Sequence, residues 1–292
     1  MAVMSLRTSA NPHIPATDDL ATLEPAAVGT AMVGDDAIWP PLADWQNPER
    51  YAYTRELGRD AWAWEFLRRN PLYRAGWARF QRDKPVEGTA VLQRFGIITW
   101  EDPARTSLDA KVLWDEHVSR FVLPLRAEHG RNDSSAPTLD LSGLRAWASV
   151  SLAEDPVQHV LFVESGRRLQ LAVSGDDLFG QVRLLADAPL DVTSFKWRMM
   201  LLHRLAHLVR HERFPERLYP PDPRGRRLAV ILRALDGWLA KTSQRRIGEA
   251  ILEGQDIDRD WRNCPCELRD RVRLTLRRGR WLMDGGYRTL LQ

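Results

Sequence analysis

Three apolar stripes at helical spacing, close together near the C-terminus, limit the possible folds of this chain more than any other feature. The first covers residues 226–240. The second covers residues 242–254, where Ile247 and Ile251 follow a Thr or Ser that can cap a helix. The third covers residues 265–283. Because each stripe can be buried only against another apolar surface, we expect three helices that pack on one another.

The order of these three helices is typical of a helix-turn-helix unit. In such a unit the second helix packs on the first through a small residue, and the third helix presents its outer face to the DNA major groove. Gly248 supplies the small residue, at a cost of about 1 kcal/mol in helix propensity relative to alanine. Residues 255–264 are longer than the usual turn of about three or four residues, so the motif predicted here has an extended turn.

The third helix, residues 265–283, has an arginine-rich side. At about 100° per residue, its core-facing side is expected to hold Leu268, Val272, Thr275, Leu276, Gly279, Leu282 and Met283. A neighbouring strip carries only arginine, namely Arg269, Arg273, Arg277 and Arg280. A solvated helix face usually mixes both signs of charge. The strip therefore indicates a surface that holds an anion, with a plain solvated face as the alternative.

The arginine strip belongs to the most basic part of the chain. Residues 224–292 contain 16 Lys and Arg against 9 Asp and Glu, a net charge of +7, whereas the rest of the chain has a net charge of −4. Such a concentrated positive charge favours an anionic partner, and nucleic acid is the first candidate. We expect Arg245 and Arg246, on the second helix, to join the four arginines of the strip in contacting phosphates and base edges of double-stranded DNA.

Aromatic residues are concentrated near the other end of the chain. Residues 44–80 contain four Trp and three Tyr. The pairs Asn47-Pro48 and Asn70-Pro71 are typical of a helix cap followed by proline in the first turn, and Asp60 is a third candidate cap. The three helices are expected near residues 48–57, 60–69 and 71–82.

These aromatic side chains have two interpretations, a small core of their own or an interface with a partner, where Trp and Tyr are enriched. The arginine helix carries a third strip, Leu274 and Trp281, which needs cover, and we expect the aromatic segment to provide it. The candidate interdomain or partner residues are Trp62, Trp64, Phe66, Tyr73, Trp77, Leu274 and Trp281.

The sequence between the two ends is mixed. Residues 95–100 are compatible with a strand, the apolar runs on either side of Ser165-Gly166 predict a β-hairpin, and residues 194–214 predict a helix. The fold class expected is therefore mainly α with a small β component (α+β). The chain is expected to divide into a disordered tail (1–41), a small helical Trp-rich interaction domain (44–100), a connecting region (101–154) and a domain with hairpin, long helix and helix-turn-helix (155–292).

Motifs for metal or catalysis are weak. His203, His207 and His211 recur every four residues, but Arg204 stands where a zinc protease has its catalytic Glu. The acidic residues of 256–267 resemble a calcium loop, but Trp261 occupies the place of the required glycine. No nucleophile motif or phosphate-binding glycine loop is found. We therefore expect no enzyme activity, no metal and no cofactor.

The compartment is predicted from what the sequence contains. No apolar run of about 18 residues is present, so no membrane contact is expected. Cys264 and Cys266 are too close together to close an unstrained disulfide. These features are typical of a cytoplasmic protein.

Two stretches resemble a known family. The stretches "RRLAVILRALDGWLAKTSQRRIGEAIL" and "LRDRVRLTLRRGRWLMDGGYRTLL" closely resemble an extended-turn helix-turn-helix domain of proteobacterial conjugative-element regulators. The stretch "YAYTRELGRDAWAWEFLRRNPLYR" resembles the small domain that precedes it in FseA-type activators, which switch on excision and transfer of integrative and conjugative elements. The resemblance covers residues 44–100 and 155–292.

The resemblance implies specific roles. One face of the C-terminal domain would bind promoter DNA and the opposite face would dock the N-terminal domain. Single-domain relatives with an acidic surface act as antiactivators by capturing that N-terminal domain. The basic face of this chain implies a transcriptional activator, with promoter DNA, RNA polymerase and an antiactivator as partners. The alternative is an antiactivator-like protein that binds another regulator instead of DNA.

Overall fold

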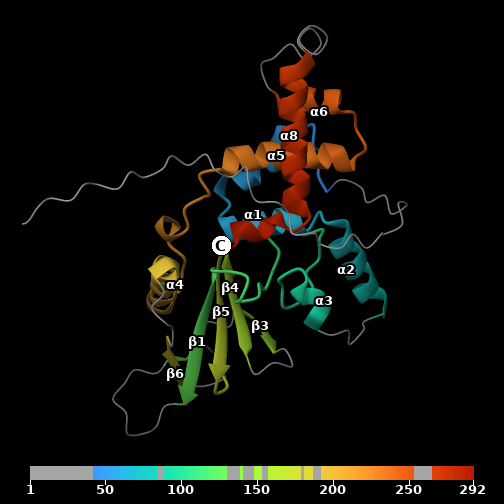
Figure 1. Cartoon of the computed structure of the whole chain (residues 1–292). Coiled ribbons are helices and arrows are strands. Elements are labelled where there is room, and N and C mark those ends of the chain that lie inside the picture. Colours follow the sequence, from blue (N-terminus) through green and yellow to red (C-terminus); the bar gives the residue numbers. More distant parts are fainter. Residues whose placement is uncertain are drawn as a thin grey trace, which may run out of the picture. The chain divides into compact units, whose positions relative to one another are not determined.

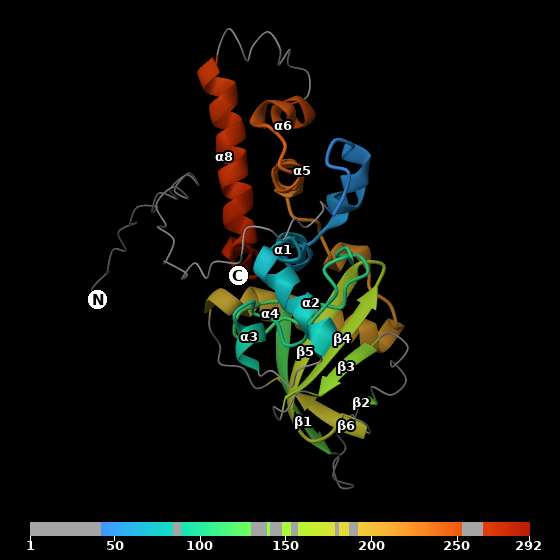
Figure 2. The same cartoon turned by 90° about the vertical axis from the view of Figure 1, so that its right-hand side faces the viewer.

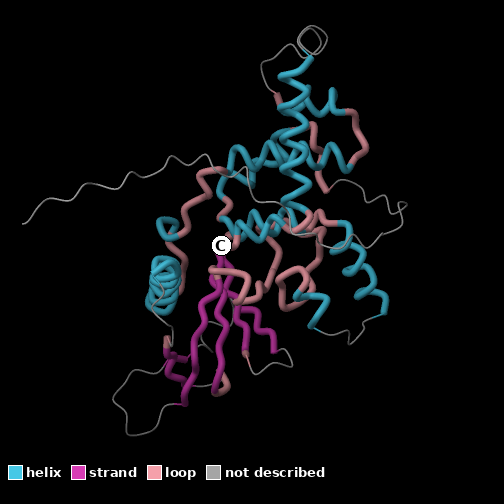
Figure 3. Tube along the Cα trace, in the orientation of Figure 1, coloured by secondary structure: helices cyan, strands magenta, loops and turns pink. Residues whose placement is uncertain are grey.

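The computed structural model describes residues 42–83, 89–129, 139–140, 148–152, 157–178, 181–186, 192–252 and 265–292. These stretches lie in one compact unit, residues 39–292. The predicted disordered tail, 1–41, and the predicted extended turn, 255–264, fall outside the described residues. Helices make up most of the described chain and the strands are gathered in one part of it (Figure 3). The predicted mainly α fold with a small β component is confirmed.

The strands form one mixed sheet. Among the described residues six strands pair in the order β2-β6-β1-β5-β4-β3. Their bounds are β1 Val122–His129, β2 Leu139–Asp140, β3 Ala148–Leu152, β4 Gln158–Glu164, β5 Arg167–Gly175 and β6 Gln181–Leu185. β1 and β5 are parallel and the other pairs are antiparallel. Part of the predicted connecting region thus supplies β1, a central strand.

The predicted hairpin around Ser165 and Gly166 is confirmed. β4 and β5 pair antiparallel, with Glu164 opposite Arg167 at the turn. Ser165 and Gly166 have φ values of 50° and 78°. Positive φ at both central residues gives a two-residue turn whose twist matches that of the strands.

One hydrophobic core lies between the sheet and helix α4 (Val192–His211), which contacts β1 and β5 (Figure 1). Leu169, Leu171 and Val173 of β5 are buried on the α4 side. The alternate residue Gln170 points to the opposite face, where its side chain accepts from the backbone N–H of Trp114 (2.9 Å) and donates to the Trp114 carbonyl (2.7 Å). β5 is therefore buried on both faces.

The second hydrophobic core joins helices from both ends of the chain. The N-terminal helices are η1 (Pro48–Glu56), α1 (Arg59–Leu67), α2 (Pro71–Asp83) and α3 (Thr89–Gln93). The C-terminal helices are η3 (Glu216–Leu218), α5 (Gly225–Leu239), α6 (Gln244–Ile251), α8 (Pro265–Met283) and η4 (Gly286–Leu290). Trp62, Trp64 and Phe66 share this core with Leu235 and Val272. In Figures 1 and 2 α5, α6 and α8 lie together, on the side of α1 away from the sheet.

Helix starts agree with the capping residues predicted from sequence, with one exception. The Asn47 side chain accepts a hydrogen bond from the backbone of Glu49, and the Asn70 side chain accepts one from the backbone of Tyr73. Ser243 caps α6 in the same way. The expectation that Asp60 caps a helix is wrong, because α1 begins after Gly58 and Asp60 lies inside its first turn.

The first predicted helix is present as a 3-10 helix, η1, but one further expectation about local structure is wrong. Residues 95–100 do not form a regular strand: in this described stretch only Ile97 pairs, through an isolated bridge to Trp114. Tertiary packing explains the difference, since Phe95 and Ile97 are buried against the aromatic core and not in a sheet.

Close packing of α5, α6 and α8 depends on glycine. A Cβ at Gly279 of α8 would lie 3.3 Å from the carbonyl oxygen of Ile231 in α5, and one at Gly237 of α5 would lie 3.0 Å from Cγ1 of Ile247 in α6. Gly248 is buried, as expected for the small residue of the motif. The three predicted helices therefore pack on one another, with α5 between N-terminal and C-terminal elements.

Candidate nucleic-acid interface

Burial along α8 follows the predicted helical wheel. The side expected to face the core is buried at Leu268, Val272, Leu276, Gly279, Leu282 and Met283, and Thr275 is half-buried. Of the predicted DNA-contacting arginines, Arg273, Arg277 and Arg280 are exposed on α8 and Arg269 is half-buried. Arg245 and Arg246 are exposed on α6, which contacts α8. The structure thus brings all six arginines onto two packed helices.

The ion pairs of these arginines are exposed. Arg245 pairs with Glu249 at 3.2 Å and Arg273 pairs with Asp270 at 3.4 Å, each within one helix. Exposed pairs of this kind contribute only about 0–1 kcal/mol, so they do not prevent a guanidinium from moving to a phosphate. Arg280 is better fixed, since its guanidinium lies 4.8 Å from the ring centroid of Trp238.

A second group of arginines lies on the other flank of α8. Arg278 stacks on the ring of Trp281 at 4.0 Å. Burial, followed by the charges of Arg227 and Arg224, lowers the pKa of Arg278. Three guanidinium groups are therefore close together here, with Asp222 paired to Arg224 at 2.7 Å. Positive charge borders α8 on both sides, and the six predicted arginines make up only one of them.

The expectation that the aromatic segment covers Leu274 is wrong. Leu274 is 58% exposed, the highest value among the exposed large hydrophobic side chains of the described residues. Trp281 is half-buried at the edge of the shared core, where it contacts Arg278 and the C-terminal turn at Gly286. The N-terminal helices contact α8 near its C-terminal end, where the Asn70 side chain donates to the Met283 carbonyl at 3.0 Å.

A substitution at Gly286 tests how Trp281 packs against the C-terminal turn. A Cβ at position 286 would overlap the six-membered ring of Trp281. We expect Gly286→Ala to displace the indole and lower the free energy of unfolding by about 1–3 kcal/mol, measured by urea denaturation. Gly225→Ala is the matched control, because the nearest atom to its new Cβ is 3.9 Å away. Equal stability of the two variants would contradict the packing.

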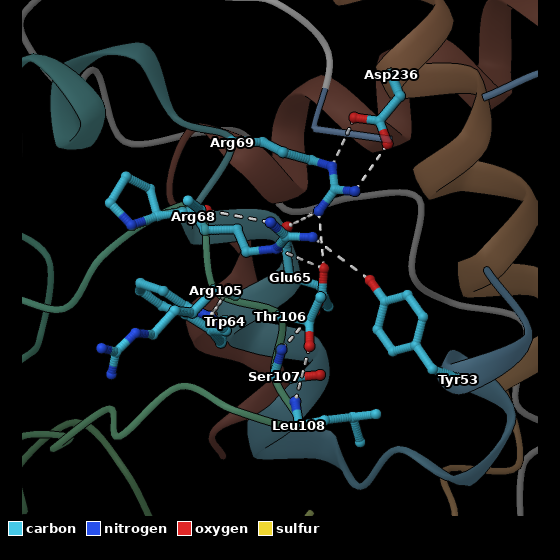
Figure 4. Close-up of polar contacts among 12 residues, drawn as sticks. Tyr53, Trp64, Glu65, Arg68, Arg69, Arg105, Thr106, Ser107, Leu108 and Asp236 are labelled. Carbon is cyan, nitrogen blue, oxygen red and sulfur yellow. Dashed lines mark hydrogen bonds and ion pairs between the residues drawn. The ribbon is translucent and has the colours of Figure 1, made fainter. Parts of the chain in front are cut away.

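The N-terminal helices dock on α5 through buried ion pairs, drawn in Figure 4. The Arg69 guanidinium donates to both carboxylate oxygens of Asp236, at 2.7 Å each, and to Glu65 at 2.9 Å. Arg68 also donates to Glu65 at 2.7 Å. The Tyr51 hydroxyl donates to Asp236 at 2.5 Å. The side chains of Arg69, Glu65 and Asp236 are fully buried, so these bonds join α1 and η1 to α5 in the interior.

Burial and neighbouring charges oppose each other in this network. Burial alone would raise the pKa of Glu65, but the guanidinium groups of Arg68 and Arg69 outweigh it and lower the pKa to about 2. Burial would lower the pKa of Arg69, but Asp236 outweighs it and raises that pKa. Burial and then Asp236 raise the pKa of Tyr51. Glu65 and Arg69 are thus held in their charged forms.

The low pKa of Glu65 predicts acid sensitivity. Because its folded value, about 2, lies below its ordinary value of 4.5, the unfolded chain binds more protons between these values. Stability is then present above about pH 4.5 and is lost as pH falls toward 2. We expect Glu65→Gln to be less stable than the wild type at pH 7 by about 3 kcal/mol and to approach it near pH 2.5, in urea denaturation at several pH values. A deficit that stays constant with pH would contradict this assignment.

Sequence reasoning missed this network. Tyr51, Glu65 and Asp236 were not among the candidate residues, although Asp236 directly follows the apolar stripe residue Leu235. A charged side chain next to an apolar stripe is the signal that could have found it, because such a charge needs a buried partner. Its partner, Arg69, follows Trp62 and Phe66 at helical spacing in the sequence, at the other end of the chain.

The predicted aromatic residues contribute mainly to the shared core. Trp62, Trp64, Phe66 and Tyr73 are fully buried, while Trp77 is half-buried beside Phe80. The Trp64 ring N–H donates to the carbonyl of Arg105 at 3.1 Å, and Tyr73 packs edge-on against Trp64. The four buried side chains are therefore covered within this chain.

The histidines of α4 lie partly at the surface. His203 and His211 are exposed, and the rings of His207 and His211 lie 4.5 Å apart. Within the described stretches no group of three or more His, Cys, Asp or Glu is arranged to hold a metal ion. The candidate calcium loop falls largely outside them. None of the described helices has the length and apolar character needed to cross a membrane.

Two family models match parts of the chain. Residues 188–292 match the model described as "T6SS, Transcription factor, DNA binding domain". Residues 44–97 match the "Proteobacterial transcriptional regulator-like domain". No curated protein matches the chain. The first match spans α4 to η4 and includes both arginine-bearing helices. The matches support a proteobacterial transcription factor family and indicate a DNA-binding transcriptional regulator.

Proposed function

We propose that this chain is a sequence-specific DNA-binding activator of transcription, acting on excision and transfer genes of an integrative and conjugative element. The observation that carries the DNA-binding part is the arginine surface of α6 and α8 inside the matched DNA-binding region. In this proposal Arg245, Arg246, Arg269, Arg273, Arg277 and Arg280 contact DNA. The activator role and the target genes rest on the resemblance of residues 44–100 and 155–292 to conjugative-element activators.

The shared core supports separate roles for the N-terminal helices and for the DNA-binding helices. α5 binds the N-terminal helices through Asp236 and supports α8 at Gly279. A DNA-binding helix must keep a fixed direction to hold its register on the duplex. We infer that the N-terminal helices stabilise this direction, and that RNA polymerase or an antiactivator would meet their outer surface. Trp77 is the candidate contact there, since it is half-buried whereas Trp62, Trp64, Phe66 and Tyr73 are fully buried.

Secretion genes are a second candidate set of targets. The description of the model that matches residues 188–292 names T6SS. A transcription factor with this domain is therefore also a candidate regulator of secretion genes. The surface that binds DNA would be the same in both cases, so the two candidates differ in the operator and not in the mechanism.

The rival function is that of an antiactivator-like protein that binds another regulator. That function requires an accessible partner surface and gives the arginines no role. The net charge of +7 over residues 224–292 favours DNA instead. The burial of four predicted partner aromatics in the chain's own core also argues against their use in capturing a second protein.

Binding of the purified full chain to three DNA fragments tests the proposal. The fragments lie upstream of excision and transfer genes, upstream of secretion genes, and in a scrambled sequence of equal length. Fluorescence anisotropy across a salt series is expected to show tighter binding to the first fragment. Tighter binding to the second fragment would assign secretion genes as the targets, with the same mode of DNA binding. Equal binding to all three would overturn sequence-specific regulation and favour the rival function.

A further inference from the structure

The outermost line of α8 is not arginine. Glu267, Asp270 and Leu274 are all exposed and follow one another at spacings of three and four residues, so they share one line along the helix. At about 100° per residue this line lies opposite the buried face that contains Val272 and Leu276. In Figure 2 α5 and α6 lie to one side of α8, and the buried residues Val272 and Leu276 belong to the core that the three helices share.

Arginines border this line on both sides. Arg273 and Arg277 lie on one flank, and Arg271 and Arg278 lie on the other. Arg278 is near Arg227 of α5. The arrangement across the exposed half of α8 is therefore positive, then acidic and apolar, then positive again. Asp270 also accepts from Arg273 at 3.4 Å.

The chemistry of the central line does not suit a phosphate. Two carboxylates would repel it, and Leu274 offers no hydrogen bond. The same groups suit base edges in the major groove, where cytosine presents an amino donor to carboxylates and thymine presents a methyl group to apolar side chains. The flanking arginines suit the phosphates of the two strands that border the groove.

The dimensions agree with this placement. An α-helix with its side chains is about 10–12 Å wide and the major groove is about 12 Å wide. The stretch from Glu267 to Arg278 spans about 18 Å along the helix axis, or about five base-pair steps of 3.4 Å. Leu274 lies near the middle of this stretch.

We propose that α8 lies in the DNA major groove with Leu274 at the groove floor, packed against the 5-methyl group of a thymine, and with arginines of both flanks on the two backbones. This inference rests on the proposed DNA-binding function and assigns a specificity residue within it. Leu274, at 58% exposed, leaves apolar surface in water that contact with a methyl group would cover. The proposal also explains why this leucine is not covered by the aromatic segment.

Replacing thymine by deoxyuridine tests the contact, since only the methyl group is lost. DNA bound by the full-length wild type is first selected from a random pool. Each thymine of the selected site is then replaced singly by deoxyuridine, and the Kd is measured by fluorescence anisotropy. One replacement is expected to weaken wild-type binding about fourfold, the factor that corresponds to burial of one methyl group. The same replacement should leave binding by Leu274→Ala unchanged.

Met199→Ala is the matched control. Met199 is an exposed apolar residue of α4, at 49% exposed, and its loss should preserve the fourfold effect. Failure of the wild type to select any sequence would overturn the proposed function itself. A selected site without a methyl-dependent position, or an effect of equal size in Leu274→Ala, would overturn the Leu274 assignment and leave DNA binding intact. Circular dichroism of each variant confirms that the comparison is between folded proteins.

Discussion

Replacing Arg269, Arg273 and Arg277 by alanine is expected to weaken DNA binding by the full chain at least a hundredfold. The three side chains belong to one strip of α8, and Arg273 and Arg277 are exposed on it. Each contact to DNA that is lost costs about 1–3 kcal/mol, and each 1.4 kcal/mol is about tenfold in Kd. Residual binding is expected from Arg245 and Arg246 on α6 and from the second flank of α8.

The salt dependence separates phosphate contacts from other effects. Each phosphate contact contributes about 0.9 to the slope of log K against log salt. If all three arginines contact phosphates, the slope should therefore fall by about 2.7. A smaller fall together with lost sequence preference would assign one or more of them to base edges. The measurement is a titration by fluorescence anisotropy on specific and scrambled DNA at several salt concentrations.

The matched control removes the same charge elsewhere. Arg50, Arg55 and Arg82 are exposed on the N-terminal helices, outside α6 and α8. Changing them to alanine lowers the net charge equally, and binding should change only slightly. If the two triple variants lose affinity equally, the effect comes from net charge alone, and the arginine strip is not the DNA-binding surface.

Sequence alone predicted those features that depend on local signals. The caps at Asn47, Asn70 and Ser243 and the turn at Ser165-Gly166 were found because a few neighbouring residues determine them. The buried side of α8 was found because helical periodicity separates core from surface within one segment. The arginine strip followed from the same wheel.

Features that depend on packing between distant segments were missed. The parallel pairing of β1 with β5 joins two strands that are separated in the sequence by β2, β3 and β4. The contact of Arg69 with Asp236 crosses most of the chain. The cover of Leu274 was mispredicted for the same reason: an apolar strip indicates a need for cover, but not which element supplies it. Docking of α1 on α5, which leaves Leu274 open, depends on charges that the apolar pattern does not show.

The buried network sets the position of the DNA-binding helices through α5. Asp236 binds Arg69 on one side of α5, and the next residue, Gly237, allows close approach of Ile247 in α6. Arg233, two-thirds of the way along α5, donates to the Ala250 carbonyl of α6 at 2.8 Å. The N-terminal docking and the packing of α6 thus meet within one turn of α5. A change at Asp236 is expected to affect stability first and DNA binding as a consequence.

Asp236→Ala is expected to lower the free energy of unfolding by about 3–5 kcal/mol. The change leaves the guanidinium of Arg69 buried with Glu65, which Arg68 already shares, and removes the acceptor of the Tyr51 hydroxyl. A buried charge without its partner costs far more than the pair itself contributes. Urea denaturation followed by circular dichroism measures the loss. Glu49→Ala is the control, because its pair with Arg55, at 3.8 Å, is exposed and should contribute at most about 1 kcal/mol.

The double change Arg69→Met and Asp236→Leu tests why Asp236→Ala is unstable. The cause is either the buried charge of Arg69 without its partner or the loss of the hydrogen-bond geometry. Replacing both charges by apolar side chains removes the uncompensated guanidinium, so most of the lost stability should return. DNA binding should return with it, since neither residue lies on the arginine surface of α6 and α8. A double variant as unstable as Asp236→Ala would mean that the hydrogen-bond geometry, and not the charge balance, holds α1 on α5. If Asp236→Ala lowers the free energy of unfolding by less than about 1 kcal/mol, the network is not what holds the N-terminal helices on α5.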